Sequence, residues 1–415
     1  MGMPSERPEI IRRMLEKSGT QEIDPTALSG TISRGMHLVR LLYKAFAERQ
    51  PVAWINVFTP PELIFGCGYI PFWLDGAGGF SGWIEMTEIF DHADAALPSR
   101  DMCTFLRAAM GGAMMNLFPP PRVVTCTSHL CEGAPKIARI GAETAGAEFH
   151  LVDVPPAESD EAVTYVADQL ETLAHRLCEL SETKLDIDRL RAAIDLSNQA
   201  RGCFHEVYEM RRRVPAPVTG SQFIGMALMY PWGTRIGVDI AESFRDEIAR
   251  RIADGVPAVP GGERYRLLWI HLRPVFETDI MAHLEQRMRA VIVQDQLGEA
   301  WWPELNAHDP FRALAVKILS NPELQPMERR IERLLRLARE YRVDGIVHFL
   351  QWGCRWNYGQ DSILKEAATE AGLPFLALDG DAVDKRATPY GQVLTRVEGF
   401  VELLETARGQ KGHSR

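Results

Sequence analysis

Cysteines are the residues of this sequence with the most distinctive potential chemistry, and the 415-residue chain contains seven of them. An odd number of cysteines in a long chain, together with an opening segment that has acidic residues and no apolar run, argues against an exported disulfide framework. The sequence contains no C-x2-C pair, so a zinc ribbon or a ferredoxin-type cluster is not indicated. Any metal site must therefore be assembled from distant segments.

Three of the cysteines stand where a predicted helix begins. Cys131 and Cys354 each follow a predicted strand, and Cys103 begins a helical pattern that Asp101 is expected to cap. The positive end of the helix dipole and the exposed backbone N–H groups at a helix start favour a thiolate. We expect these three thiols to be partly exposed and to face a cleft between two lobes.

The other four cysteines lie in apolar surroundings: Cys67 in a glycine-rich turn, Cys126 within a strand, and Cys178 and Cys203 in helices. Free cysteine is among the most buried residue types, so packing is the simpler role for all four. Cys126 forms a C-x4-C spacing with Cys131 and is a weaker candidate ligand.

Short apolar runs alternate with helical patterns, which is typical of parallel α/β structure. The predicted class is α/β, with two Rossmann-like or flavodoxin-like lobes, each built on a short parallel sheet, plus helical N-terminal and connecting segments. Ligands in such sheets bind beyond the carboxyl ends of the strands. The predicted strands are 52–58, 69–74, 122–128, 147–154, 265–272, 290–296, 345–351 and 374–380, and the predicted segments are 1–50 (helical), 51–159 (first lobe), 160–260 (helical connection) and 261–415 (second lobe).

Composition excludes several classes of protein. Hydrophobic residues make up 46% and charged residues 25% of the chain, the proportions of a globular protein. Acidic residues outnumber basic ones by 56 to 46, for a net charge of −10, so a nucleic-acid-binding surface is not expected. No apolar run reaches the length of a membrane span, and we expect a cytoplasmic protein.

Three segments together resemble the 2-hydroxyacyl-CoA dehydratase family, which includes subunits of ATP-dependent benzoyl-CoA reductases. They are PVAWINVFTPPELIFGCGYIPFWL (51–74), CTFLR (103–107) with LCEGAPK (130–136), and HFLQWGCRWNYGQD through LDGDAVDKRATPYGQVLTRVEGFVELL (348–404). Glu132 stands where the family usually has aspartate. The similarity extends more loosely over residues 35–405.

The resemblance implies a [4Fe–4S] cluster held by three cysteines, which map to Cys103, Cys131 and Cys354, with the fourth iron open to another ligand. It also implies a homologous second subunit, an acyl-CoA substrate and a separate iron–sulfur activator that hydrolyses ATP to deliver one electron. The chain itself has no G-x4-G-K-[ST] phosphate loop.

Such an enzyme eliminates water from a (R)-2-hydroxyacyl-CoA to give an enoyl-CoA. One electron added to the thioester carbonyl gives a ketyl radical anion, which expels the α-hydroxyl. A base then removes the β-proton, which is now far more acidic, and the electron is returned. The open iron acts as a Lewis acid in that chemistry.

Two further residues are candidates for catalysis. Glu62 could be a base near the cleft, although a charge that complements a helix start is the commoner role. His129 could hydrogen-bond a cluster sulfur or the substrate, although polar residues at strand ends are common. Asp379, Asp381, Asp384 and Arg396 are predicted to build a structural loop network.

Three other functions compete with the dehydratase. A benzoyl-CoA-reductase-type subunit would reduce its substrate, and a double-cubane reductase would need more ligands than the three cysteines. A cluster-holding partner subunit would bind no acyl-CoA. Several acyl groups, several fourth ligands for the iron, and substrate binding in either subunit are all compatible with the sequence.

Overall fold

The computed structural model describes residues 9–20, 27–48, 50–96 and 99–413. The chain divides into two compact units. Unit 1 comprises Met1–Cys203, Met229–Ser243 and Trp301–Gln325, and unit 2 comprises Phe204–Leu228, Phe244–Ala300 and Pro326–Arg415. The predicted segment boundaries at residues 51, 160 and 261 stay predictions, and parts of the predicted helical segment 1–50 lie outside the described residues.

Unit 1 contains a four-stranded parallel sheet with the strand order β2-β1-β3-β4. Its first three strands are fully buried, which explains why they read as continuous apolar runs. The strands are β1 (Val52–Ile55), β2 (Ile70–Trp73), β3 (Val123–Thr127) and β4 (Glu148–Val152), as predicted.

Unit 2 repeats this topology. Its four parallel strands have the order β6-β5-β7-β8. When the strands of each unit are numbered from one along the chain, both sheets have the order 2-1-3-4. Both sheets follow the flavodoxin-like pattern in which the first strand lies between the second and the third. The strands are β5 (Tyr265–Ile270), β6 (Ala290–Asp295), β7 (Gly345–Gln351) and β8 (Phe375–Gly380). The predicted α/β class is confirmed.

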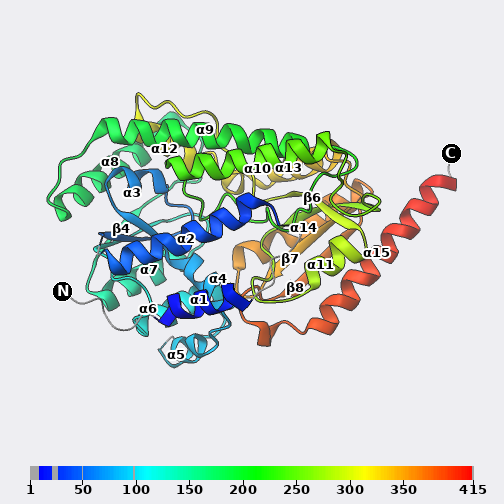
Figure 1. The fold of residues 1–415 in the computed structure, drawn as a ribbon, viewed down its shortest axis with the longest axis horizontal. Coiled ribbons are helices and arrows are strands. Elements are labelled where there is room, and N and C mark those ends of the chain that lie inside the picture. Colours follow the sequence, from blue (N-terminus) through cyan, green and yellow to red (C-terminus); the bar gives the residue numbers. More distant parts are fainter. Residues whose placement is uncertain (1–8, 21–26, 49, 97–98, 414–415) are drawn as a thin grey trace. The chain divides into compact units, whose positions relative to one another are not determined.

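Helices account for most of the remaining chain (Figure 1). Within the predicted helical connection 160–260, residues 181–186 are not helical and separate two long helices. The helices are α1 (Glu9–Thr20), α2 (Ser29–Ala47), α3 (Pro61–Gly66), α4 (Leu74–Trp83), α5 (Glu88–Ala96), α6 (Thr104–Met114), α7 (Gly133–Ala145), α8 (Asp160–Leu180), α9 (Ile187–Arg211), α10 (Arg235–Ala253), α11 (Ile280–Ala282), α12 (Pro310–Leu319), α13 (Met327–Glu340), α14 (Arg355–Glu370) and α15 (Tyr390–His413).

Glycines let α6 approach its two neighbours. A Cβ on Gly78 of α4 would overlap the carbonyl oxygen of Phe105, and a Cβ on Gly111 of α6 would overlap the carbonyl oxygen of Ile89. Backbone atoms cannot move aside as the end of a side chain can, so both positions exclude any larger residue. The glycine-rich sequence of α4 therefore fixes the position of α6.

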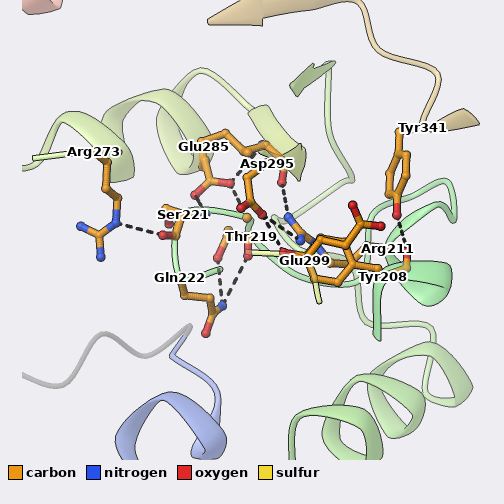
Figure 2. Close-up of polar contacts among 12 residues, drawn as sticks. Tyr208, Arg211, Thr219, Ser221, Gln222, Arg273, Glu285, Asp295, Glu299 and Tyr341 are labelled. Atoms are coloured by element: carbon orange, nitrogen blue, oxygen red, sulfur yellow. Dashed lines mark hydrogen bonds and ion pairs between the residues drawn. The ribbon is translucent and has the colours of Figure 1, made fainter. Parts of the chain in front are cut away.

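A buried polar network stabilises the core of unit 2 (Figure 2). Arg211 Nη1 lies 3.3 Å from Asp295 Oδ2, and the Tyr208 hydroxyl donates to the same oxygen at 2.9 Å. The Glu285 carboxylate accepts from the backbone N–H groups of Gly220 and Ser221 at 2.7 and 3.1 Å. Each carboxylate thus receives donors that offset the cost of its burial.

No helix in the described part of the chain is both long enough and apolar enough to cross a membrane.

Candidate functional site

Three cysteines are partly exposed at helix starts. Cys103 is the N-cap of α6, Cys354 is the N-cap of α14, and Cys131 directly precedes Glu132, the N-cap of α7. Cys103 rather than Asp101 occupies the N-cap position of α6, and the Asp101 carboxylate accepts from Ser99.

The four cysteines assigned to packing are buried, as predicted, and none of the seven forms a disulfide. Cys126 lies within β3, where its exposed fraction is zero. Cys67 and Cys178 lie close together, and burial raises the pKa of Cys67 well above its ordinary value. Exposure therefore separates the cysteines into the same two groups as their sequence contexts.

A tight contact brings the first turns of α6 and α7 together in unit 1. A Cβ on Gly133, the first residue of α7, would lie only 2.5 Å from Cδ1 of Leu106 in α6. The same position is 3.7 Å from the Cys131 sulfur. Because Leu106 is three residues beyond Cys103, this glycine contact places the helix starts that carry Cys103 and Cys131 beside each other.

The electrostatics of Cys131 differ from expectation. Burial raises the pKa of the Cys131 thiol, and the backbone N–H groups of Ala134 and Gly133 only partly offset that effect. The backbone N–H groups at this helix start lower the pKa as predicted, but desolvation of the anion outweighs them. A bound metal cation would supply the missing compensation, since it deprotonates a coordinating thiol.

Cys354 in unit 2 lies beside a buried histidine. Its sulfur is 3.9 Å from Nε2 of His271, the first residue after β5. His271 has a positive φ of 71° and is 7% exposed, and burial lowers its pKa to about 3. The imidazole is therefore neutral at pH 7.

A second histidine fixes α14, the helix that begins after Cys354. His348 on β7 contacts Asp361 Oδ1 through Nδ1 at 2.8 Å and Asn357 Oδ1 through Nε2 at 2.5 Å. The Asn357 amide in turn donates to the Phe349 carbonyl at 2.8 Å. These bonds attach the first two turns of α14 to the strand that precedes it.

Within the described residues, no three His, Cys, Asp or Glu side chains are grouped as metal ligands would be. Cys103 and Cys131 belong to unit 1, and Cys354 belongs to unit 2. The donor set itself fits an iron–sulfur cluster, because all three candidates are partly exposed thiols and thiolates are its usual ligands.

Glu62 is fully buried at the start of α3. Its Oε1 accepts from Lys317 Nζ at 2.5 Å and from the Ser197 hydroxyl at 2.6 Å, while Oε2 has no partner in the described part of the chain. The Lys317 ammonium also lies 4.0 Å from the ring centre of Trp302. Burial lowers the pKa of Lys317, and the charge of Glu62 counteracts that effect.

Sequence reasoning missed Lys317 and Ser197. A signal exists for the lysine, because Lys317 continues the buried stripe of α12 that contains Pro310, Ala313 and Leu314. A charged residue at an apolar position of a helix needs a partner.

His129 is also buried, with an exposed fraction of 5%. Burial lowers its pKa to about 3, and its ring centre lies 5.1 Å from that of Phe58. Nδ1 has no hydrogen-bond partner among the described residues. The side chain is a neutral ring whose Nδ1 is available for a hydrogen bond.

The aspartates near β8 have the predicted structural role. Asp381 Oδ1 accepts from the backbone N–H groups of Val383 and Asp384 at 2.8 and 2.9 Å. Arg396 Nη1 lies 3.4 Å from Asp379 Oδ2. These contacts organise the loop after the last strand.

The fold and the candidate site define a two-sheet α/β protein whose partly exposed thiols lie at helix starts. A family model described as "2-hydroxyglutaryl-CoA dehydratase, D-component" matches residues 56–404. The chain therefore belongs to the 2-hydroxyglutaryl-CoA dehydratase D-component family, a family of enzymes whose named reaction makes them lyases.

Individual relatives agree with this assignment. The chain is 24% identical to lactoyl-CoA dehydratase subunit alpha of Anaerotignum propionicum, over 87% of this chain and 92% of the relative. It is 24% identical to (R)-2-hydroxyglutaryl-CoA dehydratase subunit alpha of Acidaminococcus fermentans, over 77% and 68% of the two chains. It is 25% identical to a subunit of benzoyl-CoA reductase from Thauera aromatica, over 76% and 79%.

Proposed function

We propose that the chain is the iron–sulfur subunit of an ATP-activated radical dehydratase that eliminates water from a (R)-2-hydroxyacyl-CoA to give an enoyl-CoA. The observation that carries the proposal is the set of three partly exposed thiols at helix starts, in a chain of the 2-hydroxyglutaryl-CoA dehydratase D-component family.

Cys103, Cys131 and Cys354 are the residues that would hold a [4Fe–4S] cluster. When bound, the cluster would supply a one-electron donor with one iron open as a Lewis acid. The protein itself positions the three thiols. The glycine contact between α6 and α7 positions two of them, and the attachment of α14 to β7 positions the third.

Glu62 and His129 have different uses in this proposal. A general base works best when its pKa lies near the working pH. His129, with its pKa lowered to about 3, is unsuited to accept a proton and better suited to hydrogen bonding with substrate or a sulfur. Glu62 is the stronger candidate base, since its Oε2 is unpartnered in the described structure and Lys317 and Ser197 hold its orientation.

The partners follow from the same proposal. The dehydratase relatives above are named as alpha subunits, which supports a homologous second subunit for this chain. A separate activator would hydrolyse ATP and deliver the electron. We place the assembly in the cytoplasm.

Iron analysis and an activity assay test the proposal. The chain is purified or reconstituted without oxygen and its iron is measured on its own, before the second subunit and the activator are added for the activity assay. We expect about four irons per chain and formation of an enoyl-CoA from a 2-hydroxyacyl-CoA. About eight irons would indicate two cubane clusters instead. Iron-free protein after proper reconstitution would overturn the assignment.

A matched pair of cysteine variants tests the ligands. Cys354→Ser should lose iron and activity, because a serine hydroxyl replaces a thiolate ligand. Cys203→Ala should retain both, since Cys203 is buried in α9. Retention of iron and activity by Cys354→Ser would sink the ligand assignment.

Reduction is the second candidate reaction, because a subunit of benzoyl-CoA reductase is among the similar proteins. Benzoyl-CoA offered to the same loaded assembly distinguishes the two activities. Ring reduction without dehydration would replace our proposal with this one. A loaded cluster that turns over neither substrate would indicate a cluster-holding subunit without catalysis.

A further inference from the structure

His271 is brought to Cys354 by the geometry of two neighbouring strands. β5 and β7 are parallel and adjacent, and Ile270 at the end of β5 pairs with His348 of β7. β7 continues beyond this pair to Gln351, and Cys354 follows. His271 therefore leaves β5 beside the last residues of β7, and its Nε2 lies 3.9 Å from the sulfur of Cys354, which follows three residues after that strand ends.

The backbone of His271 is held from the other side of β5. Its N–H donates to Oε1 of Gln296 at 3.1 Å, and the N–H of Gln296 donates to the Trp269 carbonyl at 3.0 Å. The φ of 71° turns the chain sharply at this point, in a region where histidine, asparagine and aspartate are the most tolerated side chains after glycine. The backbone therefore fixes the direction in which the His271 side chain leaves the main chain.

The two ring nitrogens have unequal surroundings. Nε2 lies 3.9 Å from the Cys354 sulfur, a distance that suits the longer hydrogen bonds made to sulfur. Nδ1 is buried and has no hydrogen-bond partner in the part of the chain that the structure describes. His271 is only 7% exposed, and its contact with the Cys354 sulfur is made through Nε2.

This asymmetry selects the proton position. A thiolate can only accept, so a lone pair on Nε2 would face an anion while a proton on Nδ1 would be a buried donor without an acceptor. With the proton on Nε2, the ring makes a charge-assisted bond to sulfur and leaves only a buried lone pair, which costs less.

We infer that His271 is a positioning residue that donates a hydrogen bond from Nε2 to the thiolate of Cys354 and thereby raises the reduction potential of the cluster that Cys354 would hold. The inference rests on the proposed function, because it assumes that Cys354 is a cluster ligand. Hydrogen bonds to cluster sulfurs withdraw negative charge and favour the reduced state, so electron uptake becomes easier.

Two substitutions distinguish the effect of the hydrogen bond from that of the unusual backbone conformation at residue 271. His271→Asn keeps a side chain that tolerates the positive φ, but its amide reaches only as far as Nδ1 of the original ring. His271→Gln places an amide nitrogen near the position of Nε2 and so can restore the donor.

The experiment is a redox titration of the reconstituted cluster in the assembled enzyme, with iron content measured on the same samples. We expect full iron content in both variants, a more negative midpoint potential for His271→Asn, and a potential for His271→Gln that returns toward the wild-type value. Equal potentials at equal iron content would overturn the inference and leave the proposed function intact. Wild-type protein without iron would overturn both.

A measurement on wild-type protein covers the case in which His271→Asn does not fold or load. Electron–nuclear double resonance of the reduced cluster, with ¹⁵N-labelled histidine and in H2O against D2O, reports any histidine N–H near the unpaired spin. We expect an exchangeable proton and a ¹⁵N coupling that persist in a His129→Asn control. Absence of both signals in the wild type would overturn the inference.

Discussion

At the residue scale, the buried pair of Glu62 and Lys317 shows what the sequence could not predict. The two residues are 255 positions apart and meet inside unit 1. The helix-start position of Glu62 could be read from TPPELI, but its partner could not, because no local pattern encodes such a distant contact. The same is true of His271 and Cys354, which are 83 positions apart. In contrast, the burial of each cysteine followed from its own element and was predicted correctly.

Removing the lysine from that pair should be strongly destabilising. Lys317→Met leaves the Glu62 carboxylate buried without its counter-charge, and we expect a loss of about 3–5 kcal/mol in the free energy of unfolding. The double variant Lys317→Met with Glu62→Gln should lose less than the sum of the single losses, because neither charge is then stranded. Urea denaturation of the full chain measures all four proteins.

The control for this cycle is Arg312→Ala, which removes the exposed ion pair with Asp160 in the same unit. We expect a loss below about 1 kcal/mol from that change. Additive losses for Lys317 and Glu62 would show that the two side chains do not depend on each other, against our interpretation of the pair.

At the scale of elements, glycine determines how accurately α6 presents Cys103. Gly78→Ala would drive a methyl group into the carbonyl oxygen of Phe105, so α4 and α6 must separate. We expect a lower melting temperature and incomplete iron loading, because Cys103 caps the displaced helix. Gly202→Ala is the matched control, since nothing lies within 4 Å of a Cβ there.

Gly202→Ala should stabilise α9 by about 0.5–1 kcal/mol and leave iron content unchanged. Iron analysis and thermal denaturation of the two variants make the comparison. Full iron loading and an unchanged melting temperature in Gly78→Ala would show that α6 does not depend on the close approach.

A histidine on α2 gives this helix a pH dependence. Burial lowers the pKa of His37 to about 4 from its ordinary value of 6.5, and Arg40 and Lys44 act in the same direction. Between pH 6.5 and about 4, His37 is therefore protonated in the unfolded chain but neutral in the folded chain. The free energy of unfolding decreases as pH falls through this range. The loss approaches at most about 1.4 kcal/mol per pH unit.

The His37→Gln variant isolates this contribution. Its stability relative to the wild type should rise as pH falls through that window and stay constant above pH 6.5. Urea midpoints of both proteins across the window provide the measurement, since other titrating groups affect the two proteins alike. A difference that does not change with pH would contradict the assignment.

At the scale of the whole molecule, the sequence predicts the strands but not their order in the two sheets. All eight strands of the described residues were predicted, because buried parallel strands are continuous apolar runs bounded by turns. The strand order that the two sheets share could be determined only from the structure, because an apolar run does not indicate which strand it will pair with. Nor do the sequence patterns indicate that each unit is assembled from three separate stretches of chain.

Because the three proposed ligands come from both units, iron binding should couple their stabilities. A ligand that binds only the folded state stabilises every element that must be folded to bind it, and each 1.4 kcal/mol or so of such stabilisation slows exchange about tenfold. Hydrogen–deuterium exchange of the iron-loaded chain should therefore show slower exchange in both α7 and α14 than in the chelated protein, and the Cys354→Ser variant should lose that protection in α14. Slower exchange confined to α7 in the wild type would mean that Cys354 does not share the metal with Cys103 and Cys131, and that the chain binds iron through unit 1 alone.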